Sequence, residues 1–558
     1  MQNKLTGAHI VLESLLAEGV EVMFGYPGGT VIPFFDAFSD YKNLHHVLVR
    51  HEQGAAFAAD GYARASGKVG VCLATSGPGA TNLVTGIANA YMDSIPVVAI
   101  TGQVRGDMIG SDAFQEVDIL GITLPITKHN YFVEDARDIP RIMKEAFYIA
   151  RTGRPGPVHI DIPTNVFKQE VEKFEYPEKV NLPGFKIPGR ADDQLVKDTV
   201  NLIKNSQKPV IICGHGTIIS KAEKELFELA TRSHIPVVHT ILGKGAFPES
   251  HELSYGMLGM HGMAYANFAV HNADLLIGIG TRFDDRITGS LDTFAKEAKI
   301  VHIDIDPSEI GKNVKPYLPV VGDIKTVLKQ MLEILPNKKH TDWIGQIEGW
   351  TKSYPLSTKN THRITVPEML TELHKITKGD SIIVTDVGQH QMWTAQYYAQ
   401  DESCKFLTSG GLGSMGYGLP AAIGARFARP NEEIWLINGD GGIQMNIQEL
   451  MTIVQEKLEI KIAIMNNGFL GMVRQWQELF YDKNYEGTPI TSPDFSLIAQ
   501  AYGLTHLRCE KKEDIASTIN ATRDIKGTVI CEFITEPEDN VFPMVAPGKG
   551  LKDTLIGR

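Results

Sequence analysis

The chain has 558 residues, of which 43% are hydrophobic and 22% are charged, and its formal net charge is −12. This length fits about three domains of ~150 residues, and the acidic balance excludes a basic nucleic-acid-binding surface. No apolar run reaches ~18 residues and the N-terminus lacks an export pattern, so we expect no membrane span and a cytoplasmic protein. The five cysteines are scattered without a CxxC spacing, which favours reduced thiols over disulfides or a zinc site.

The first part of the chain alternates predicted helices with apolar strands. Side chains at helical spacing predict helices over 6–19, near 52–65 and near 79–91. Apolar runs predict strands at 47–49, 69–75 and 95–101. Apolar strands that alternate with helices favour a parallel sheet covered on both faces. A charged, proline-rich passage from about 168 to 194 then predicts a linker.

The same alternation recurs twice further along the chain. The second stretch has predicted strands at 209–213, 236–239, 275–279 and 300–304. After a polar passage at about 337–364, the third stretch has predicted strands at 382–385, 434–437, 462–465 and 529–534. We interpret the chain as three doubly wound parallel-sheet α/β domains. Their predicted bounds are 1–170, 190–338 and 364–540, followed by a C-terminal tail at 541–558.

An acidic glycine turn and an asparagine pair follow two predicted strands of the third domain. The turn is Gly439-Asp440-Gly441-Gly442, and the pair is Asn466-Asn467. A helix predicted over 446–458 connects them, and a right-handed crossover would place both strand ends at one sheet edge. Such oxygen ligands suit Mg²⁺ beside diphosphate oxygens, and the glycines would admit the phosphates. An ordinary Asp-Gly turn with an unrelated asparagine pair is the alternative.

Three further stretches carry groups that a coenzyme could use. Glu52 begins a predicted helix, where a carboxylate ordinarily complements the helix dipole. If it is instead buried against an aminopyrimidine ring, its raised pKa would let it share a proton with a ring nitrogen. The turn at 386–390 offers donors for diphosphate oxygens. The glycine-rich stretch 409–418 contains Met415, which either packs in the core or wedges beneath a bent coenzyme.

These stretches together resemble those of the thiamine diphosphate (ThDP) enzymes. In the metal signature of that family, the Asp, the second Asn and a backbone carbonyl two residues later hold Mg²⁺, which here implies Asp440, Asn467 and Phe469. From 5 to about 547 the chain is similar to the acetohydroxyacid synthase (acetolactate synthase) catalytic subunits. The most specific shared stretches are Arg282-Phe-Asp-Asp-Arg286 and Met472-Val-Arg-Gln-Trp476.

The resemblance implies a role for each matching position. Glu52, Gly29 and Gln115 would form the reaction centre. Coenzyme contacts would come from Gly388, Gln389, His390, Gly413, Met415, Gly439, Gly441, Gly442 and Met472. The family's middle domain carries FAD, for which the candidates are Arg154, Gly214, Gly216, His261, Gly262, Arg282, Asp284, Arg286 and Asp304. The pocket for the second substrate would be shaped by Phe114, Met472, Val473 and Trp476. For Arg282, a surface ion pair with Asp284 or Asp285 is the alternative.

The resemblance also implies an activity and partners. Such an enzyme decarboxylates pyruvate on ThDP and transfers the hydroxyethyl unit to pyruvate or to 2-oxobutanoate, the first common step of branched-chain amino-acid biosynthesis. A homodimer or homotetramer is expected, with a possible small regulatory subunit and no nucleic-acid or membrane partner. Three alternatives remain: a catabolic acetolactate synthase that uses only pyruvate, a pyruvate oxidase, and a non-catalytic binding module.

One position departs from the family pattern. Where the family reads Asp-x-Pro-Lys-Asp, this chain has Asp161-Ile-Pro-Thr164-Asn165. If the family lysine holds a substrate carboxylate or the flavin, Thr164 removes that contact. We expect altered affinity without loss of the chemistry, since the activating carboxylate and the metal ligands are present.

Overall fold

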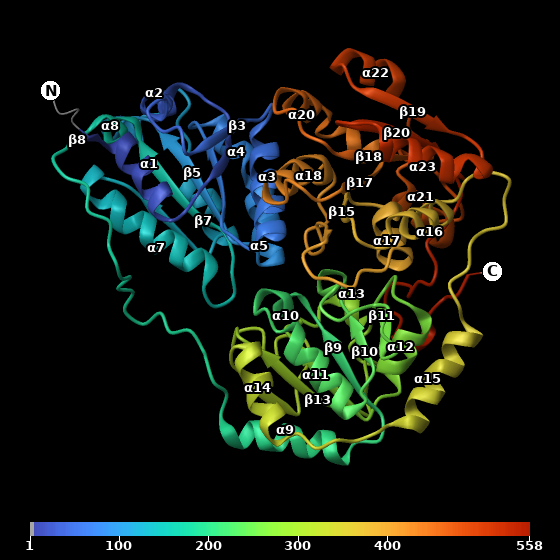
Figure 1. The fold of residues 1–558 in the computed structure, drawn as a ribbon. Coiled ribbons are helices and arrows are strands. Elements are labelled where there is room, and N and C mark those ends of the chain that lie inside the picture. Colours follow the sequence, from blue (N-terminus) through green and yellow to red (C-terminus); the bar gives the residue numbers. More distant parts are fainter. Residues whose placement is uncertain (1–4, 558) are drawn as a thin grey trace.

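The computed structural model describes residues 5–557, and three α/β domains make up most of this part of the chain. Figure 1 shows the first domain (blue to teal) beside the third (orange to red), with the middle domain (green to yellow) below both. Each domain has a six-stranded sheet whose neighbouring strands are all parallel. The predicted fold class is therefore confirmed.

The first sheet has the strand order β3-β2-β4-β5-β7-β6. Its strands are β2 (Val22–Gly25), β3 (His45–Leu48), β4 (Gly70–Ala74), β5 (Val97–Gln103), β6 (His129–Phe132) and β7 (Val158–Pro163). Its helices are α1 (Gly7–Ala17), α2 (Ile32–Phe38), α3 (Glu52–Ser66), α4 (Pro78–Asn82), α5 (Val84–Asp93), α6 (Ile119–Thr123), α7 (Ile139–Arg151) and α8 (Thr164–Lys168). Helices α1 and α7 cover one face and α3 and α5 the other, because the central strands are apolar on both sides.

The third sheet repeats this arrangement, with the order β16-β15-β17-β18-β20-β19. Its strands are β15 (Ile382–Thr385), β16 (Phe406–Leu407), β17 (Ile434–Gly439), β18 (Lys461–Asn466), β19 (Thr505–Cys509) and β20 (Val529–Ile534). Its helices are α16 (Val366–Thr377), α17 (Gln389–Tyr397), α18 (Gly418–Ala428), α19 (Asp440–Gln444), α20 (Leu450–Gln455), α21 (Gly471–Phe480), α22 (Phe495–Tyr502) and α23 (Ile515–Asp524). The first and third domains therefore share one topology.

The middle sheet has a different strand order, β11-β10-β9-β12-β13-β14. Successive strands are added toward one edge from β9 to β11 and toward the other edge from β12 to β14, so the order reverses between β9 and β12. Its strands are β9 (Pro209–Cys213), β10 (Val237–His239), β11 (Ser254–Met257), β12 (Leu275–Ile279), β13 (Lys299–Asp304) and β14 (Leu318–Val321). Its helices are α9 (Asp193–Asn205), α10 (His215–Ile219), α11 (Glu223–Ser233), α12 (Ala264–His271), α13 (Asp285–Thr288), α14 (Ile324–Ile334) and α15 (Thr341–Ser353). This is the strand order of dinucleotide-binding sheets, which bind ligands at the point of reversal.

Helices α3 and α18 join the first and third domains. They lie side by side at the centre of Figure 1, and buried side chains of both domains form one continuous core around them. Their backbones approach closely: a Cβ on Gly424 would lie 1.9 Å from the carbonyl oxygen of Ala58, and one on Gly61 2.3 Å from that of Ala421. Glycine is needed at both positions because no side chain fits between the helices.

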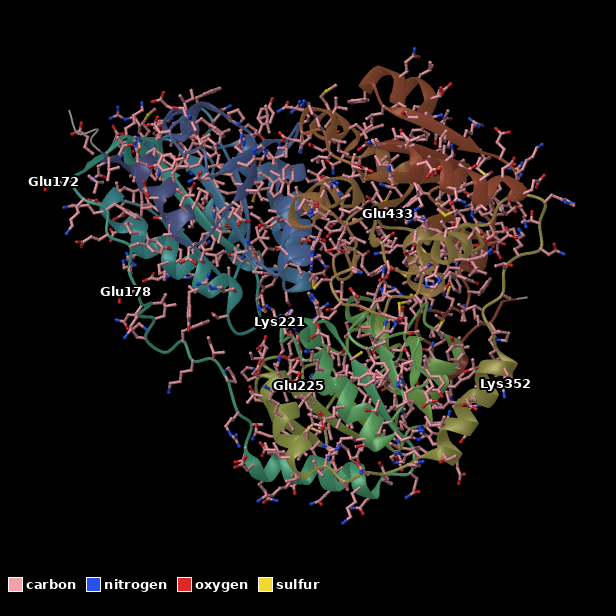
Figure 2. The ribbon with its side chains drawn as sticks, viewed as in Figure 1. Glu172, Glu178, Lys221, Glu225, Lys352 and Glu433 are labelled. Atoms are coloured by element: carbon pink, nitrogen blue, oxygen red, sulfur yellow. The ribbon has the colours of Figure 1, made fainter. Side chains whose placement is uncertain are left out.

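The segments outside the domains differ in how they pack. The segment 172–191 runs along the outside of the molecule, and Figure 2 shows Glu172 and Glu178 on it. Before it, β1 (Leu5–Thr6) pairs with β8 (Glu170–Val171) in a two-stranded antiparallel sheet. The C-terminal tail returns to the middle domain, where Val545 and Leu551 join the apolar core.

Two predicted helices differ from the structure. The helix predicted over 446–458 is shorter: a 3₁₀ turn at Ile447–Glu449 leads into α20, which ends before Lys457 at a φ of 52°. The side chain of Asn446 donates to the carbonyl of Gly416, which holds that residue outside the helix. The helix predicted near 79–91 is divided at Leu83 into α4 and α5. Within residues 5–557, no helix is long and apolar enough to span a membrane.

Candidate active site

A small cavity of about 60 Å³ lies at the carboxyl ends of β15, β17 and β18. All three predicted metal ligands line it, and Asp440 comes directly after β17 while Asn467 follows β18. The same cavity is lined by nearly all the predicted coenzyme residues, namely Gly388, Gln389, His390, Met415, Gly439, Gly441, Gly442 and Met472. The crossover predicted from the sequence thus brings the acidic turn and the asparagine pair together.

Asp440 is buried, and its partners within residues 5–557 are neutral. Its carboxylate accepts hydrogen bonds from Ser492 Oγ at 2.7 Å and from the amide of Gly468 at 3.2 Å. Burial raises the pKa of Asp440, although these donors oppose the shift. Burying a carboxylate without a positive partner costs free energy, so this position is suited to binding a cation. Near it, Asn467 Oδ1 accepts from the amide of Phe469 at 3.0 Å.

Two polar atoms of the cavity lack a hydrogen-bond partner in the described chain. These are Gln389 Oε1 and His390 Nε2, both of them buried. Burial lowers the pKa of His390 to about 4, so its ring is neutral near pH 7. Orphaned buried groups of this kind are rare unless a ligand or water satisfies them. The donor set of one carboxylate, one amide and one carbonyl also fits Mg²⁺.

Glycine is required in the acidic turn by close approach. A Cβ on Gly442 would lie 2.7 Å from both Asn438 Oδ1 and Asp386 Oδ1. The carboxylate of Asp386 in turn accepts hydrogen bonds from the amides of Gly416 and Gly418, at 3.1 and 2.9 Å. Asp386 therefore fixes the second half of the glycine-rich stretch 409–418 against the end of β15. Met415 directly precedes Gly416 and lines the cavity.

A second, larger cavity of about 1030 Å³ opens from the middle domain toward the first. It lies at the reversal point of the middle sheet, where ligands of such sheets bind. Seven of the nine residues predicted for FAD line it: Arg154, Gly216, His261, Arg282, Asp284, Arg286 and Asp304. Gly214 and Gly262 are not among its lining residues, because each packs against backbone of its own domain.

The charged groups of this cavity come from different domains. Arg154 of the first domain donates to Ser94 Oγ at 2.8 Å and pairs with Glu309 of the middle domain at 2.6 Å. Burial raises the pKa of Asp304 to about 6. His261 Nδ1 is buried without a partner in residues 5–557, and burial lowers the pKa of this ring to about 4. The cavity thus offers cations and an unsatisfied polar atom to a large ligand.

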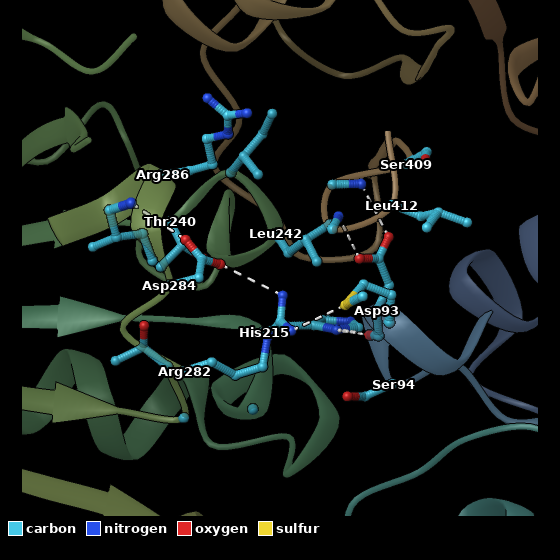
Figure 3. Close-up of a pocket in the computed structure, with 18 of the residues that line it drawn as sticks. Asp93, Ser94, His215, Thr240, Leu242, Arg282, Asp284, Arg286, Ser409 and Leu412 are labelled. Carbon is cyan, nitrogen blue, oxygen red and sulfur yellow. Dashed lines mark hydrogen bonds and ion pairs between the residues drawn. The ribbon is translucent and has the colours of Figure 1, made fainter. Parts of the chain in front are cut away.

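The position of Arg282 is compatible with both interpretations offered by the sequence. It lines the larger cavity, and its guanidinium also lies 3.5 Å from the carboxylate of Asp284. A second N–H of Arg282 points at Met92 Sδ, 3.4 Å away. Figure 3 shows Arg282 and Asp284 facing each other in the cavity.

Helix α21 forms the wall where the two cavities meet. Met472 and Val473 line both cavities, and Trp476 lines the larger one a turn further on. Gly388 and Met415 also line both. An apolar wall with an indole is able to discriminate substrates that differ by a methylene, worth about 1–3 kcal/mol.

The predicted reaction-centre residues of the first domain, and the predicted substrate residue Phe114, lie elsewhere. Within the described chain, Glu52, Gly29, Gln115 and Phe114 line neither cavity. Glu52 begins α3, where its carboxylate accepts a hydrogen bond from Asn82 Nδ2 at 2.9 Å. Gln115 has a φ of 61°, and the side chain of Phe114 is 87% exposed. A single copy of the chain therefore does not bring these residues to the predicted metal ligands.

Within the described residues, the motif at 161–165 that departs from the family pattern also lies outside both cavities. Thr164 begins α8, and Asn165 Oδ1 accepts from the amide of Gly106 at 2.9 Å. Sequence reasoning missed the contacts of Asn82 with Glu52 and of Ser492 with Asp440, and it named the turn of Asp386 without its contact to the glycine-rich stretch. The sequence pointed to Asp386, because this residue begins the turn at 386–390. The sequence did not point to Ser492, because this residue lies far from any motif.

Comparisons with known proteins identify the family of the chain. Family models for the N-terminal TPP binding domain, the central domain and the C-terminal TPP binding domain of thiamine pyrophosphate enzymes match residues 5–122, 196–331 and 386–533. These matches define a thiamine pyrophosphate enzyme. The acetolactate synthase large subunit of Mycobacterium tuberculosis is 49% identical over 98% of this chain and 90% of its own length. That of Cyanidium caldarium is 48% identical over 99% and 96%. The chain belongs to the acetolactate synthase large subunits, and its coenzyme is thiamine diphosphate.

Proposed function

We propose that the chain decarboxylates pyruvate and transfers the two-carbon hydroxyethyl unit to a second 2-oxoacid. The products are 2-acetolactate from pyruvate and 2-aceto-2-hydroxybutyrate from 2-oxobutanoate, the first common step toward valine, leucine and isoleucine. The observation that supports this is the junction of the two cavities, where Met415, Met472 and Val473 face both. A coenzyme site that opens onto an apolar wall suits the addition of a second carbonyl substrate.

The small cavity would hold the diphosphate end of the coenzyme and Mg²⁺. Asp440, Asn467 and the carbonyl of Phe469 would ligate the cation, which would relieve the cost of burying the carboxylate. The neutral His390 would donate from its unpaired Nε2 to a diphosphate oxygen, and the unpaired Gln389 Oε1 would accept from a donor of the bound ligand. Bound thiamine diphosphate supplies an electron sink for decarboxylation. The protein then contributes orientation and a water-poor environment.

The large cavity would hold FAD, with no net redox step assigned to it. Support comes from its volume of about 1030 Å³, from its position at the sheet reversal, and from the unpaired His261 Nδ1. Arg154, Arg282 and Arg286 would provide positive charge for a diphosphate. The flavin would lie near α21 because the cavity extends to Trp476.

The active unit would be a homodimer, in which Glu52 of one copy faces the small cavity of the other. Support comes from the distribution of the site, since Glu52, Gly29 and Gln115 line neither cavity of their own described chain. The first domain also exposes large apolar side chains close to these residues in sequence, as expected of an unpaired interface. They include Ile32, Met108, Ile109, Phe114 and Leu124. Tetramers and a small regulatory subunit are compatible with this arrangement.

In the dimer, Glu52 would act on the coenzyme ring. Its carboxyl group sits at a helix N-terminus and is fixed by the amide of Asn82. From there it would share a proton with a ring nitrogen of the coenzyme and so act as a general acid–base group. A Glu52→Gln variant keeps the shape and the hydrogen bond from Asn82 but removes the titratable group. We expect it to lower turnover by about 100-fold or more.

The decisive experiment is competition between pyruvate and 2-oxobutanoate on the purified protein without oxygen, with flavin absorbance recorded. We expect both products, a preference set by α21, and an unchanged flavin spectrum. Flavin reduction with acetate as product would identify a pyruvate oxidase. No bound flavin and no reaction with 2-oxobutanoate would identify the catabolic enzyme. Undiminished turnover of Glu52→Gln would refute the assigned role of Glu52.

A further inference from the structure

A cluster of buried charges lies where α3 and α5 of the first domain meet the third domain. Arg64 pairs with Asp60 at 2.5 Å and with Asp93 at 2.8 Å. The arginine side chain is 6% exposed and both carboxylates are fully buried. Tyr417 of the third domain donates to Asp60 at 2.8 Å, and Asn89 of α5 donates to it at 3.2 Å. Every charged group of the cluster is thus paired, as burial at this depth requires.

Asp93 extends this cluster to the glycine-rich stretch of the third domain. Its two carboxylate oxygens accept hydrogen bonds from the amides of Gly411 at 2.7 Å and Gly410 at 3.0 Å. Figure 3 shows these bonds between Asp93 and the loop that carries Ser409 and Leu412. The contact is close, because a Cβ on Gly411 would lie 2.7 Å from the carboxylate of Asp93. A side chain at position 411 would therefore block this contact.

The neighbouring residues of α5 strengthen the same attachment. Ser409 Oγ donates to Asn89 Oδ1 at 2.6 Å, and the amide of Ser414 donates to Ser409 Oγ at 2.9 Å. The carbonyl of Asp93 also accepts from His215 Nδ1 of the middle domain at 3.0 Å. Asp93 is therefore in contact with all three domains.

The glycine-rich stretch is held at both ends as a result. Asp93 and Asn89 fix 409–411, while Asp386 fixes the amides of Gly416 and Gly418. The residues between them have little intrinsic rigidity, because glycine restricts the backbone least. Met415 lies on this segment and lines both cavities, so its position depends on the two anchors.

We propose that Asp93, held in place by Arg64, is a positioning residue that fixes the segment 409–415 and thereby places Met415 in the coenzyme site. Arg64 orients the carboxylate of Asp93 and compensates its charge, so that both oxygens face the amides of Gly410 and Gly411. The inference rests on the proposed function only in assigning Met415 to the coenzyme. It adds a requirement that the first domain preorganise the coenzyme site of its own chain.

The test compares coenzyme binding in Asp93→Asn with that in the wild-type protein. The amide side chain keeps one acceptor oxygen and loses the pairing with Arg64, so the segment should loosen. ThDP is titrated in the presence of Mg²⁺, and binding is followed by tryptophan fluorescence, since Trp393 and Trp476 line the two cavities. We expect the dissociation constant of ThDP to rise about tenfold or more, as for loss of a buried hydrogen bond to a charged group. The pyruvate KM at saturating ThDP should change far less.

Two further variants separate positioning from general stability. Gly411→Ala leaves the charges intact but would place a Cβ 2.4 Å from Met92 Cγ and 2.7 Å from the Asp93 carboxylate, so it pushes the segment away from α5 and should weaken ThDP binding similarly. Glu18→Gln removes a buried carboxylate of the first domain that pairs with Lys144 and Arg151, away from the segment, and should leave ThDP affinity unchanged. ThDP affinity within about twofold of wild type in both Asp93→Asn and Gly411→Ala would overturn the inference, since loss of a buried charged hydrogen bond predicts a larger change. So would equal weakening in Glu18→Gln. If the wild-type protein binds ThDP but forms no acetolactate, the proposed function fails while this inference stands.

Discussion

The contact between α3 and α18 predicts that Gly424→Ala destabilises the protein. A Cβ at this position would lie 1.9 Å from the carbonyl oxygen of Ala58 and 2.7 Å from the amide nitrogen of Tyr62. Ordinary contacts of a Cβ begin at 3.4 Å, so the helices would have to separate by about 1.5 Å. The atoms in the way belong to the backbone of α3, which cannot move aside as a flexible side chain would.

The magnitude follows from two opposing effects. Overpacking of a close-packed core costs about 1–3 kcal/mol, and backbone displacement favours the upper end of this range. Replacing glycine by alanine within a helix gains up to about 1 kcal/mol from helix propensity. We therefore expect Gly424→Ala to lower the free energy of unfolding by about 2 kcal/mol. Because α3 begins at Glu52, the displacement should also lower turnover.

Gly345→Ala serves as the matched control. Gly345 is an exposed residue inside α15, and a Cβ added there would have no described atom outside its own helix within 4 Å. Only the propensity effect remains at this position, so the variant should gain about 0.5–1 kcal/mol. Urea denaturation of both variants measures the difference, which we expect to be about 3 kcal/mol. Equal stability of the two variants would refute the close-approach argument.

Three other measurements test the site and the fold. Burial raises the pKa of Asp161 to about 7, so the folded state binds the proton more tightly and stability falls as pH rises from about 4 to 7. About three pKa units correspond to about 4 kcal/mol over the whole window, of which about two units, or about 3 kcal/mol, lie between about pH 5 and about pH 8. Asp161→Asn should lack this pH dependence in urea titrations at about pH 5 and about pH 8. Asp440→Asn should abolish the rise in melting temperature that Mg²⁺ and ThDP together give the wild-type protein; an unchanged rise would exclude it as a metal ligand. Trp476→Leu should change the ratio of the two products in the competition assay by about tenfold while ThDP affinity stays constant.

The sequence predicted those features that depend on local pattern. Each predicted strand overlaps a strand of the structure, because buried parallel strands are continuous apolar runs. Most of the strands it missed lie at sheet edges, such as β6 and β19, whose residues are largely half-buried or exposed. That the predicted metal ligands meet in one cavity was predictable because Asp440 and Asn467 each follow a strand, and parallel strands end at a common edge.

Only the tertiary structure decided which distant segments meet. Asp93 reaches amides more than 300 residues away, and nothing in the local sequence of α5 marks that contact. The tail likewise joins the middle domain through Val545 and Leu551 although it follows the third in the chain. The separation of Glu52 from both cavities of its own chain is of the same kind. The physical reason is that domain packing depends on the shape of whole surfaces, whereas sequence spacing reports only on neighbours along the chain.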